Sequence, residues 1–367
     1  MGAQGARDAR ARAGSAYRAH APDRRREAPE RRRMGARAAR RRPPAVQRLR
    51  RGQGRGARLE PRAGVRRPPR AATGRGLTVR IAIAQCAPAL GAFKRNVAMH
   101  EEWIGRAQSA RARLVVFPEL SLTGYYLKDL AGDIACAADD ERLGPIADAS
   151  RRIDVCAGFV ERAPDARLHI AQGYWSGGRL VHVHRKVYLP TYGIFDDGRY
   201  FGPGERFDVF ESAIGPSGLA ICEDLWHVSV PYTYAATGAT VVLSPASSPG
   251  RGVAEGGDLG TAESCRLMDR FYAQYLTLYV LFANRVGHED GIAFWGGSEV
   301  VAPDGTVVAR APEFEEHLLV AEIDPDLVAR ERDRNPLIRD ERPDLVQSHL
   351  ARRTGLVRRP DVAVERS

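Results

Sequence analysis

The sequence predicts an α/β chain that folds as a layered sandwich, with sheets inside and helices outside. Strand-like runs outnumber helical ones, and many of them form pairs joined by hairpin turns. The chain has no GxGxxG after a strand and no GxxxxGK followed by Ser or Thr, so dinucleotide-binding and P-loop folds find no support. These observations favour a mixed sandwich over a simple doubly wound sheet.

Composition divides the chain near residue 78. Residues 1–78 contain 24 Arg, no Lys and 5 acidic residues, a net charge of +19, which leaves the remaining 289 residues at −8. This first segment has few large apolar side chains, so it cannot bury enough surface to offset its ordering entropy. We expect a disordered tail at 1–78, a folded domain at 79–324 and a C-terminal arm at 325–367.

The Arg-rich tail has three competing interpretations. It is the product of a mis-assigned start codon, an arm that binds nucleic acid or another polyanion, or an organelle transit peptide. Clustered Arg neutralises phosphates, which supports the second, whereas the near absence of Ser weakens the third. The rest of the chain is mildly acidic, so we expect nucleic acid as a partner only through the tail.

The strands are predicted from short apolar or alternating runs. Residues 78–86 alternate and then turn apolar, and the run at 114–117 ends at Pro118-Glu119. A Ser-Gly-Gly sequence joins two further runs as a hairpin, and Pro303-Asp-Gly305 marks another tight turn. The expected strands are 78–86, 114–117, 153–160, 169–175, 180–187, 219–222, 239–244, 279–283, 299–301, 306–309 and 318–323.

Two helices are predicted from apolar residues at helical spacing. In residues 92–111 the apolar face consists of Val97, Trp103, Ile104 and Ala107. In residues 261–277 the expected core positions are Cys265, Met268, Phe271 and Tyr275. The charged stretch at 325–350 is expected to be partly helical.

Cysteine usage indicates a reducing compartment. The chain has five Cys, an odd number with no CxxC pair, and no apolar signal segment. No apolar run reaches the roughly 18 residues needed to span a bilayer. We therefore expect a cytoplasmic protein with no membrane partner.

Three segments carry an ionisable residue where a buried strand ends. Glu119 follows Val-Val-Phe-Pro, and burial there raises the pKa of a carboxyl toward the range of a general base. Lys186 is one of three Lys against 53 Arg, which indicates a need for a compact point charge. Cys222 lies where a strand turns into a loop or helix, and backbone N–H groups with a nearby cation would favour its thiolate.

Each of these residues has an ordinary alternative when judged alone. Glu119 would cap a helix, Lys186 would lie on an edge-strand surface, and Cys222 would be an inert buried thiol. The other four thiols, Cys86, Cys136, Cys156 and Cys265, are expected to be inert. Together, however, the three occur in the order Glu, Lys, Cys, at separations of 67 and 36 residues.

In this order the segments resemble the nitrilase superfamily of carbon–nitrogen hydrolases, and the match covers roughly residues 79–345. The supporting sequences are Arg80-Ile-Ala-Ile-Ala-Gln-Cys86, Asn284-Arg-Val-Gly287 and Phe294-Trp-Gly-Gly-Ser-Glu-Val-Val-Ala-Pro-Asp-Gly305. The resemblance implies a four-layer α-β-β-α sandwich with a catalytic triad. Cys222 would be the nucleophile, Glu119 the general base and Lys186 its positive partner.

Within the superfamily the chain is most similar to the glutaminase domain of glutamine-dependent NAD synthetases. Cys222-Glu-Asp-Leu-Trp226 and the sequence from Lys186 to Asp197 carry this likeness, whereas the Ser-Gly-Gly-x-Asp-Ser loop of the synthetase half is absent. We therefore expect a free-standing amidase of that subtype. Many members carry a second Glu after the Lys, and Asp197 stands at this position. It would order Lys186 and the substrate amide, or catalysis would be weaker.

The resemblance places Tyr192, Glu223 and Trp226 near the substrate. Glu223 would meet an α-ammonium such as that of glutamine. The structural alternatives are core packing for Tyr192 and Trp226, and an ion pair with an Arg for Glu223.

The expected reaction is hydrolysis of a small-molecule amide to a carboxylate and ammonia through a cysteine thioester. The alternatives are a stand-alone glutaminase that supplies ammonia to a separate synthetase, and a non-catalytic scaffold on the same fold. Nitrile hydrolysis is less favoured by the Cys-Glu-Asp-Leu-Trp context. No metal or cofactor is expected, because no cluster has ligand spacing. By resemblance, the chain would form a homodimer or higher homo-oligomer through its outer helices.

Overall fold

A computed structural model of the chain describes residues 78–252 and 259–354. The expected tail therefore lies outside the described residues except for Thr78, as do residues 355–367 of the expected C-terminal arm. Within the described part, no helix is long and apolar enough to cross a membrane.

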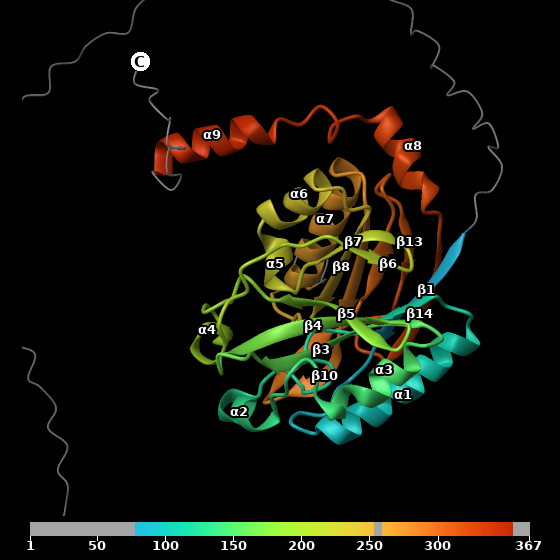
Figure 1. Ribbon diagram of the computed structural model, residues 1–367. Coiled ribbons are helices and arrows are strands. Elements are labelled where there is room, and N and C mark those ends of the chain that lie inside the picture. The colour runs from blue at the N-terminus through green and yellow to red at the C-terminus, as the bar shows by residue number, and fades with distance from the viewer. Residues whose placement is uncertain (1–77, 253–258, 355–367) are drawn as a thin grey trace, which may run out of the picture. The chain divides into compact units, whose positions relative to one another are not determined.

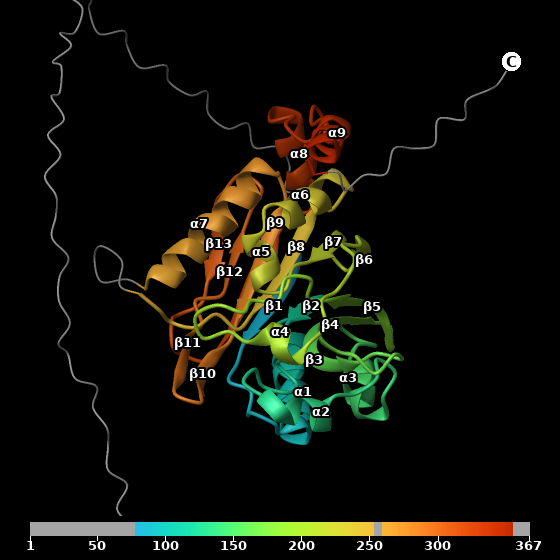
Figure 2. The same ribbon diagram turned by 90° about the vertical axis from the view of Figure 1, so that its left-hand side faces the viewer.

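Two six-stranded sheets lie face to face at the centre of the fold (Figures 1 and 2). The first sheet has the order β14-β1-β2-β3-β4-β5 and the second β13-β12-β9-β8-β7-β6. The first comprises β1 (Val79–Gln85), β2 (Leu114–Val116), β3 (Asp154–Arg162), β4 (Leu168–Ser176), β5 (Arg179–Arg185) and β14 (His317–Ile323). The second comprises β6 (Phe210–Ser212), β7 (Gly215–Leu219), β8 (Val241–Ala246), β9 (Tyr279–Asn284), β12 (Glu299–Val301) and β13 (Val307–Arg310). A separate hairpin pairs β10 (Val286–Glu289) with β11 (Ile292–Trp295).

Each sheet is buried on both of its faces, so the core consists of one layer between the sheets and one layer between each sheet and its helices. In β1, Ile81 and Ile83 pack with Leu243 of the second sheet in the cluster between the sheets. The intervening Ala82 points the opposite way and packs with Trp103 of α1 (Phe93–Ser109), because successive side chains of a strand alternate between faces. The order is therefore helix, sheet, sheet, helix, and the expected four-layer α-β-β-α sandwich is confirmed.

The outer layers are helical. On the first sheet lie α1 and α3 (Gly144–Ala149), and on the second lie α6 (Ser229–Ala236) and α7 (Gly260–Tyr275) (Figure 2). Short helices occupy the connections, namely α2 (Ala131–Ile134), α4 (Asp197–Tyr200) and α5 (Glu223–Trp226). In both views α8 (Asp326–Arg334) and α9 (Pro343–Thr354) lie beyond one end of the sheets (Figures 1 and 2).

The strand directions bring distant segments to one edge of the sandwich. Strands β1, β2 and β3 are parallel, and so are β7, β8 and β9. The chain reaches Glu119 shortly after β2, Lys186 directly after β5 and Cys222 shortly after β7. Carboxyl ends of strands that run the same way meet at the same edge of a sheet, so these three residues approach one another.

The predicted turns are confirmed, whereas two other details are wrong. Gly177 and Gly178 link β4 to β5 with φ values of +60° and +83°, the left-handed conformation that a two-residue hairpin turn requires. The strand expected at 219–222 ends at Leu219, because the chain then turns into α5. In α7, Phe271 and Tyr275 are 45 % and 53 % exposed rather than buried. The helix instead buries a face of small and polar residues, namely Ala262, Cys265, Asp269, Tyr272 and Ala273.

Candidate active site

Glu119 lies in the turn after β2 and joins the two sheets. Its side chain is fully buried, and its Oε2 accepts a 2.9 Å hydrogen bond from the N–H of Ser247, which follows β8. Its backbone carbonyl accepts a 3.1 Å bond from the Ser247 hydroxyl. Burial raises the pKa of Glu119, and Lys186 opposes this rise without cancelling it. The expected direction of this pKa shift is confirmed.

Lys186 is fully buried beside two carboxylates. Its ammonium donates hydrogen bonds of 2.7 Å to Glu119 and 2.8 Å to Asp197. Burial alone would lower the pKa of Lys186, but the charges of Asp197 and Glu119 raise it well above its usual value. An ammonium has three N–H donors, so one remains for a third acceptor. The surface-lysine alternative is wrong.

Asp197, the first residue of α4, is the second carboxylate partner of Lys186. Its Oδ2 accepts from Lys186, and its Oδ1 accepts a 2.8 Å bond from the hydroxyl of Tyr125. Both oxygens of this buried carboxylate are therefore engaged by the protein. Asp197 thus contacts Lys186 directly, as one of its two expected roles requires.

Cys222 occupies a strained turn between β7 and α5. Its φ of +46° and ψ of −98° lie in a region that non-glycine residues rarely adopt. The turn is held on both sides, since the N–H of Cys222 donates to Pro245 at 2.8 Å and its carbonyl accepts from Leu225 at 3.1 Å. Strain of this kind concentrates at functional positions.

The expectation that the surroundings of Cys222 favour its thiolate is wrong. Burial and then the charge of Glu119 raise the pKa of the Cys222 thiol well above its usual value. Lys186 and a hydrogen bond from the backbone of Ser247 act in the opposite direction but do not prevail. The resting residue is therefore a neutral thiol that needs a base, and Glu119 is the carboxylate whose charge reaches it.

Cys222 is also the one thiol of the five that is not fully enclosed. The other four are buried, and burial raises the pKa of each to about 12. Those residues are Cys86, Cys136, Cys156 and Cys265. Their predicted inertness agrees with this burial.

Of the expected substrate residues, Tyr192 and Trp226 are exposed and Glu223 is buried. Tyr192 and Trp226 are 56 % and 43 % exposed, so the core-packing alternative is wrong for both. The hydroxyl of Tyr192 lies 2.9 Å and 3.0 Å from the two carboxylate oxygens of Glu223. Nε2 of His227 lies 3.8 Å from Oε1 of the same Glu223. Burial raises the pKa of Glu223. Among the described residues its partners include no arginine, so the expected alternative of an Arg ion pair is not found there.

Two spaces adjoin this group of residues. A cavity of about 400 Å³ opens over Tyr125 and Asp197, and aromatic residues including Tyr126 and Phe195 complete its wall. A void of about 10 Å³ lies between Cys222 and α7. The larger space is wide enough for a small molecule.

A carboxylate, an ammonium and a thiol brought together from three distant segments are a constellation for acyl transfer. A sequence model described as carbon-nitrogen hydrolase matches residues 80–333 of the chain. The chain belongs to the carbon-nitrogen hydrolase family.

This carbon-nitrogen hydrolase is similar to larger proteins over part of their length. The glutamine-dependent NAD(+) synthetase of Thermotoga maritima is 32 % identical over 256 residues, which are 68 % of this chain and 42 % of that protein. The enzyme of the same name from Acinetobacter baylyi is 28 % identical over 245 residues, 67 % of this chain and 44 % of that protein. The chain thus spans less than half the length of these relatives.

Solved structures agree with the fold. The glutamine-dependent NAD+ synthetase of Acinetobacter baumannii superposes with a TM-score of 0.61 at 29 % identity, covering 69 % of this chain and 47 % of that one. An amidase from Nesterenkonia sp. AN1 superposes with a TM-score of 0.64 at 22 % identity, covering 75 % and 98 %. The second likeness shows the shared sandwich.

Asp224 belongs to the Cys222-Glu-Asp-Leu-Trp226 motif, but the sequence did not predict a role for it. It is fully buried, and its carboxylate accepts bonds of 3.0 Å from the N–H of Ile221 and 3.0 Å and 2.9 Å from those of Val187 and Tyr188. His184 Nε2 lies 2.9 Å from its Oδ2. Asp224 therefore ties the turn of Cys222 to the segment that follows Lys186.

Glu289 is a second positioning residue that the sequence did not reveal. Its Oε2 accepts 3.0 Å bonds from the N–H groups of both Tyr125 and Tyr126, and Arg285 pairs with its other oxygen. These bonds fix the loop that aims Tyr125 at Asp197. The only signal in the sequence was the Asn-Arg-Val-Gly motif, which contains Arg285.

Proposed function

We propose that this carbon-nitrogen hydrolase is an amidase that cleaves the carboxamide of a small molecule to a carboxylate and ammonia. The observation that carries the proposal is the buried ammonium of Lys186, bonded to Glu119 and Asp197 beside the neutral thiol of Cys222. A thiol with a raised pKa becomes nucleophilic only if a base removes its proton during attack.

The proposed reaction begins when Glu119 takes the proton of Cys222 and the sulfur attacks the amide carbonyl carbon. The carbonyl oxygen becomes an oxyanion held by the remaining N–H of Lys186 and the backbone N–H of Glu223. Preorganised donors of this kind contribute about 3–4 kcal/mol each. Glu119 then gives its proton to the departing amine, and ammonia leaves a thioester on Cys222.

The second half regenerates the enzyme. Glu119 removes a proton from water, whose oxygen attacks the thioester carbonyl. The carbon–sulfur bond breaks, the carboxylate product leaves, and the sulfur regains the proton from Glu119. In this scheme Asp197 and Tyr125 keep the ammonium in place rather than touching the substrate, because both Asp197 oxygens already have partners.

A glutaminase is the second candidate function, and Glu223 favours it. This buried carboxylate lies next to the proposed nucleophile and accepts hydrogen bonds from the hydroxyl of the exposed Tyr192. An α-ammonium of the substrate would pair with it, as in glutamine or another ω-amide of an amino acid. The glutamine-dependent synthetases that the chain resembles are consistent with this class. The ammonia would then be released or used by a separate enzyme.

The test is ammonia release from a panel of glutamine, asparagine, simple ω-amides and N-carbamoyl compounds. We expect at least one amide to be hydrolysed, Cys222→Ser to abolish turnover, and a stalled thioester to appear in the intact mass of the wild type. Cys136→Ala, a buried thiol on another part of the fold, should keep the activity. Full activity of Cys222→Ser would refute the mechanism, and silence of the wild type on every amide would support the scaffold alternative.

A further inference from the structure

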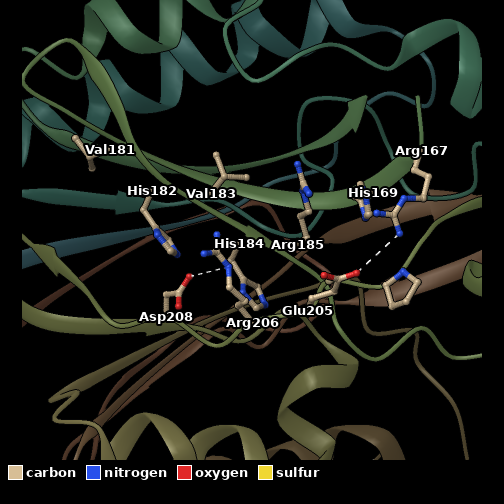
Figure 3. Close-up of a pocket in the computed structure, with 12 residues that line it drawn as sticks. Arg167, His169, Val181, His182, Val183, His184, Arg185, Glu205, Arg206 and Asp208 are labelled. Atoms are coloured by element: carbon tan, nitrogen blue, oxygen red, sulfur yellow. Dashed lines mark ion pairs between the residues drawn. The ribbon is translucent and has the colours of Figure 1, made fainter. Parts of the chain in front are cut away.

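A second cavity, of about 660 Å³, opens at the edge of the sandwich where β5 and β6 end their sheets (Figure 3). One wall is β5, with His182, His184 and Arg185, and the other is the segment before β6, with Glu205, Arg206 and Asp208. None of the residues proposed for catalysis lines it. The cavity has the size of a small-molecule site.

The cavity is rich in hydrogen-bond donors that are held in place but not used up. Arg185 donates bonds of 2.6 Å and 2.8 Å to Glu161, which lies outside the cavity lining. Arg167 is anchored in the same way by a 2.6 Å bond to Asp165. Arg206 forms an ion pair with Asp208 at 3.4 Å. A guanidinium carries about five N–H donors, so each keeps several for an oxyanion, which Arg binds in a two-pronged geometry.

Two histidines of the cavity lack partners that their burial calls for. His169 is 1 % exposed, and its Nδ1 lies 2.8 Å from the carbonyl of Gly202, which can only accept. Its Nε2 is therefore an acceptor, and it has no partner among the described residues. His182 stacks on Phe210 with ring centroids 4.3 Å apart, and its buried Nε2 is likewise unpartnered. A buried nitrogen without a partner is unfavourable, and a donor on a ligand would satisfy it.

The floor of the cavity is connected to the proposed active site. His184 is 3 % exposed and contacts Asp224 at 2.9 Å. Asp224 in turn accepts hydrogen bonds from the N–H of Ile221, which precedes Cys222, and from the N–H of Val187, which follows Lys186. A ligand that contacts His184 can therefore shift the geometry of both catalytic segments through one buried carboxylate.

We propose that this cavity is an effector site for a small phosphate ester that carries hydroxyl groups, and that His184 and Asp224 couple it to catalysis. The guanidinium groups bind the phosphate, and the imidazole nitrogens of His169 and His182 accept from the hydroxyls. The binding part is independent of the proposed function, whereas the effect on turnover rests on it.

Binding is tested with ribose 5-phosphate as the probe, by calorimetry and by the shift of Tm. We expect ribose 5-phosphate to bind more tightly than inorganic phosphate and ribose alone not to bind. Arg206→Gln should weaken binding at least tenfold, because it removes a guanidinium of the cavity lining whose side chain is exposed and pairs with Asp208 at 3.4 Å. The matched control is Arg151→Gln, an exposed Arg that pairs with Asp148 at 3.4 Å and lies outside the cavity lining. No binding of the ester, or equal losses in both variants, would overturn the site.

Coupling is tested by a readout that needs no amide substrate. We expect ribose 5-phosphate to change the rate at which iodoacetamide alkylates Cys222 by at least threefold. His184→Gln, which removes the imidazole from Asp224, should abolish this change while binding persists. An unchanged alkylation rate at saturating ester overturns the coupling even if the ester binds. The kcat/KM of amide hydrolysis, where an amide is found, should change in the same direction.

Discussion

The sharpest test of the proposed chemistry is Asp197→Asn, because it changes one charge beside Lys186 and almost nothing in shape. The ammonium of Lys186 is fully buried and has carboxylate partners at 2.7 Å and 2.8 Å. Leaving a buried charge with no partner costs about 3–5 kcal/mol. Here Glu119 remains and asparagine keeps an oxygen acceptor, so the loss is closer to one charge-assisted bond, about 1.5–3 kcal/mol.

If this loss falls on the placement of the ammonium in the transition state, kcat/KM drops by about 10- to 100-fold. The substitution also changes the pH dependence. The charge of Asp197 raises the pKa of Glu119, so a neutral asparagine lets the pKa of Glu119 fall. Glu119 works as a base only when ionised, and activity is lost as the pH drops through its pKa. The acid limb of the kcat/KM profile should therefore move to lower pH.

The assay is ammonia release from the best amide of the panel across a pH series. The matched control is Asp196→Asn, the preceding residue, whose side chain is 62 % exposed and lies 4.0 Å from Arg199 rather than at Lys186. That variant should behave as the wild type. An unaltered kcat/KM with an unmoved acid limb in Asp197→Asn, or equal losses in the two variants, would show that Asp197 does not order the ammonium.

Three further outcomes are expected. Glu223→Gln should raise KM for glutamine about tenfold or more, since it removes the charge that meets an α-ammonium, and should leave kcat/KM for a simple amide unchanged; equal losses on both substrates would contradict this role. Asp224→Asn should lower the free energy of unfolding in urea by about 2–3 kcal/mol, because an amide oxygen cannot satisfy all four groups that now contact the carboxylate. The exposed Asp165→Asn should leave the free energy of unfolding unchanged, and equal unfolding midpoints for the two variants would argue against this role of Asp224. Because burial raises the pKa of Cys222, its alkylation by iodoacetamide should be slow at neutral pH and accelerate as the pH rises; a fast, pH-independent reaction would indicate a preformed thiolate.

The resemblance to the nitrilase superfamily implied that Glu119, Lys186 and Cys222 converge, whereas the sequence pattern alone indicated only that each lies where a buried strand ends. The hairpin turn at Gly177-Gly178 was predicted from the sequence directly, because two glycines readily adopt the left-handed conformation that this turn requires. The face of α7 was not readable. Leu267 and Phe271 are more apolar than Asp269, yet the helix buries Asp269 against the second sheet.

The sequence did not predict residues whose hydrogen-bond partners lie far away along the chain. Glu289 bonds the N–H of Tyr125, 164 positions away, and no local pattern encodes that distance. The shift in the Cys222 pKa was misjudged in sign for the same kind of reason. The sequence placed a cation near the thiol but gave no measure of how deeply the thiol and the Glu119 carboxylate are buried together.

That error in sign changes how the site must work. The buried ammonium of Lys186 is bonded to two carboxylates, Glu119 and Asp197, and the charge of Glu119 acts on Cys222. Burial first, and then the charge of Glu119, oppose loss of the thiol proton to solvent, which is why the pKa of Cys222 lies well above its usual value. Transfer of the same proton to Glu119 leaves the total charge unchanged and only moves it from oxygen to sulfur. In the proposed scheme the ammonium of Lys186, whose charge lowers the pKa of Cys222, would also stabilise the oxyanion. Under the proposed mechanism, the thiolate would therefore form only as Glu119 takes the proton of Cys222.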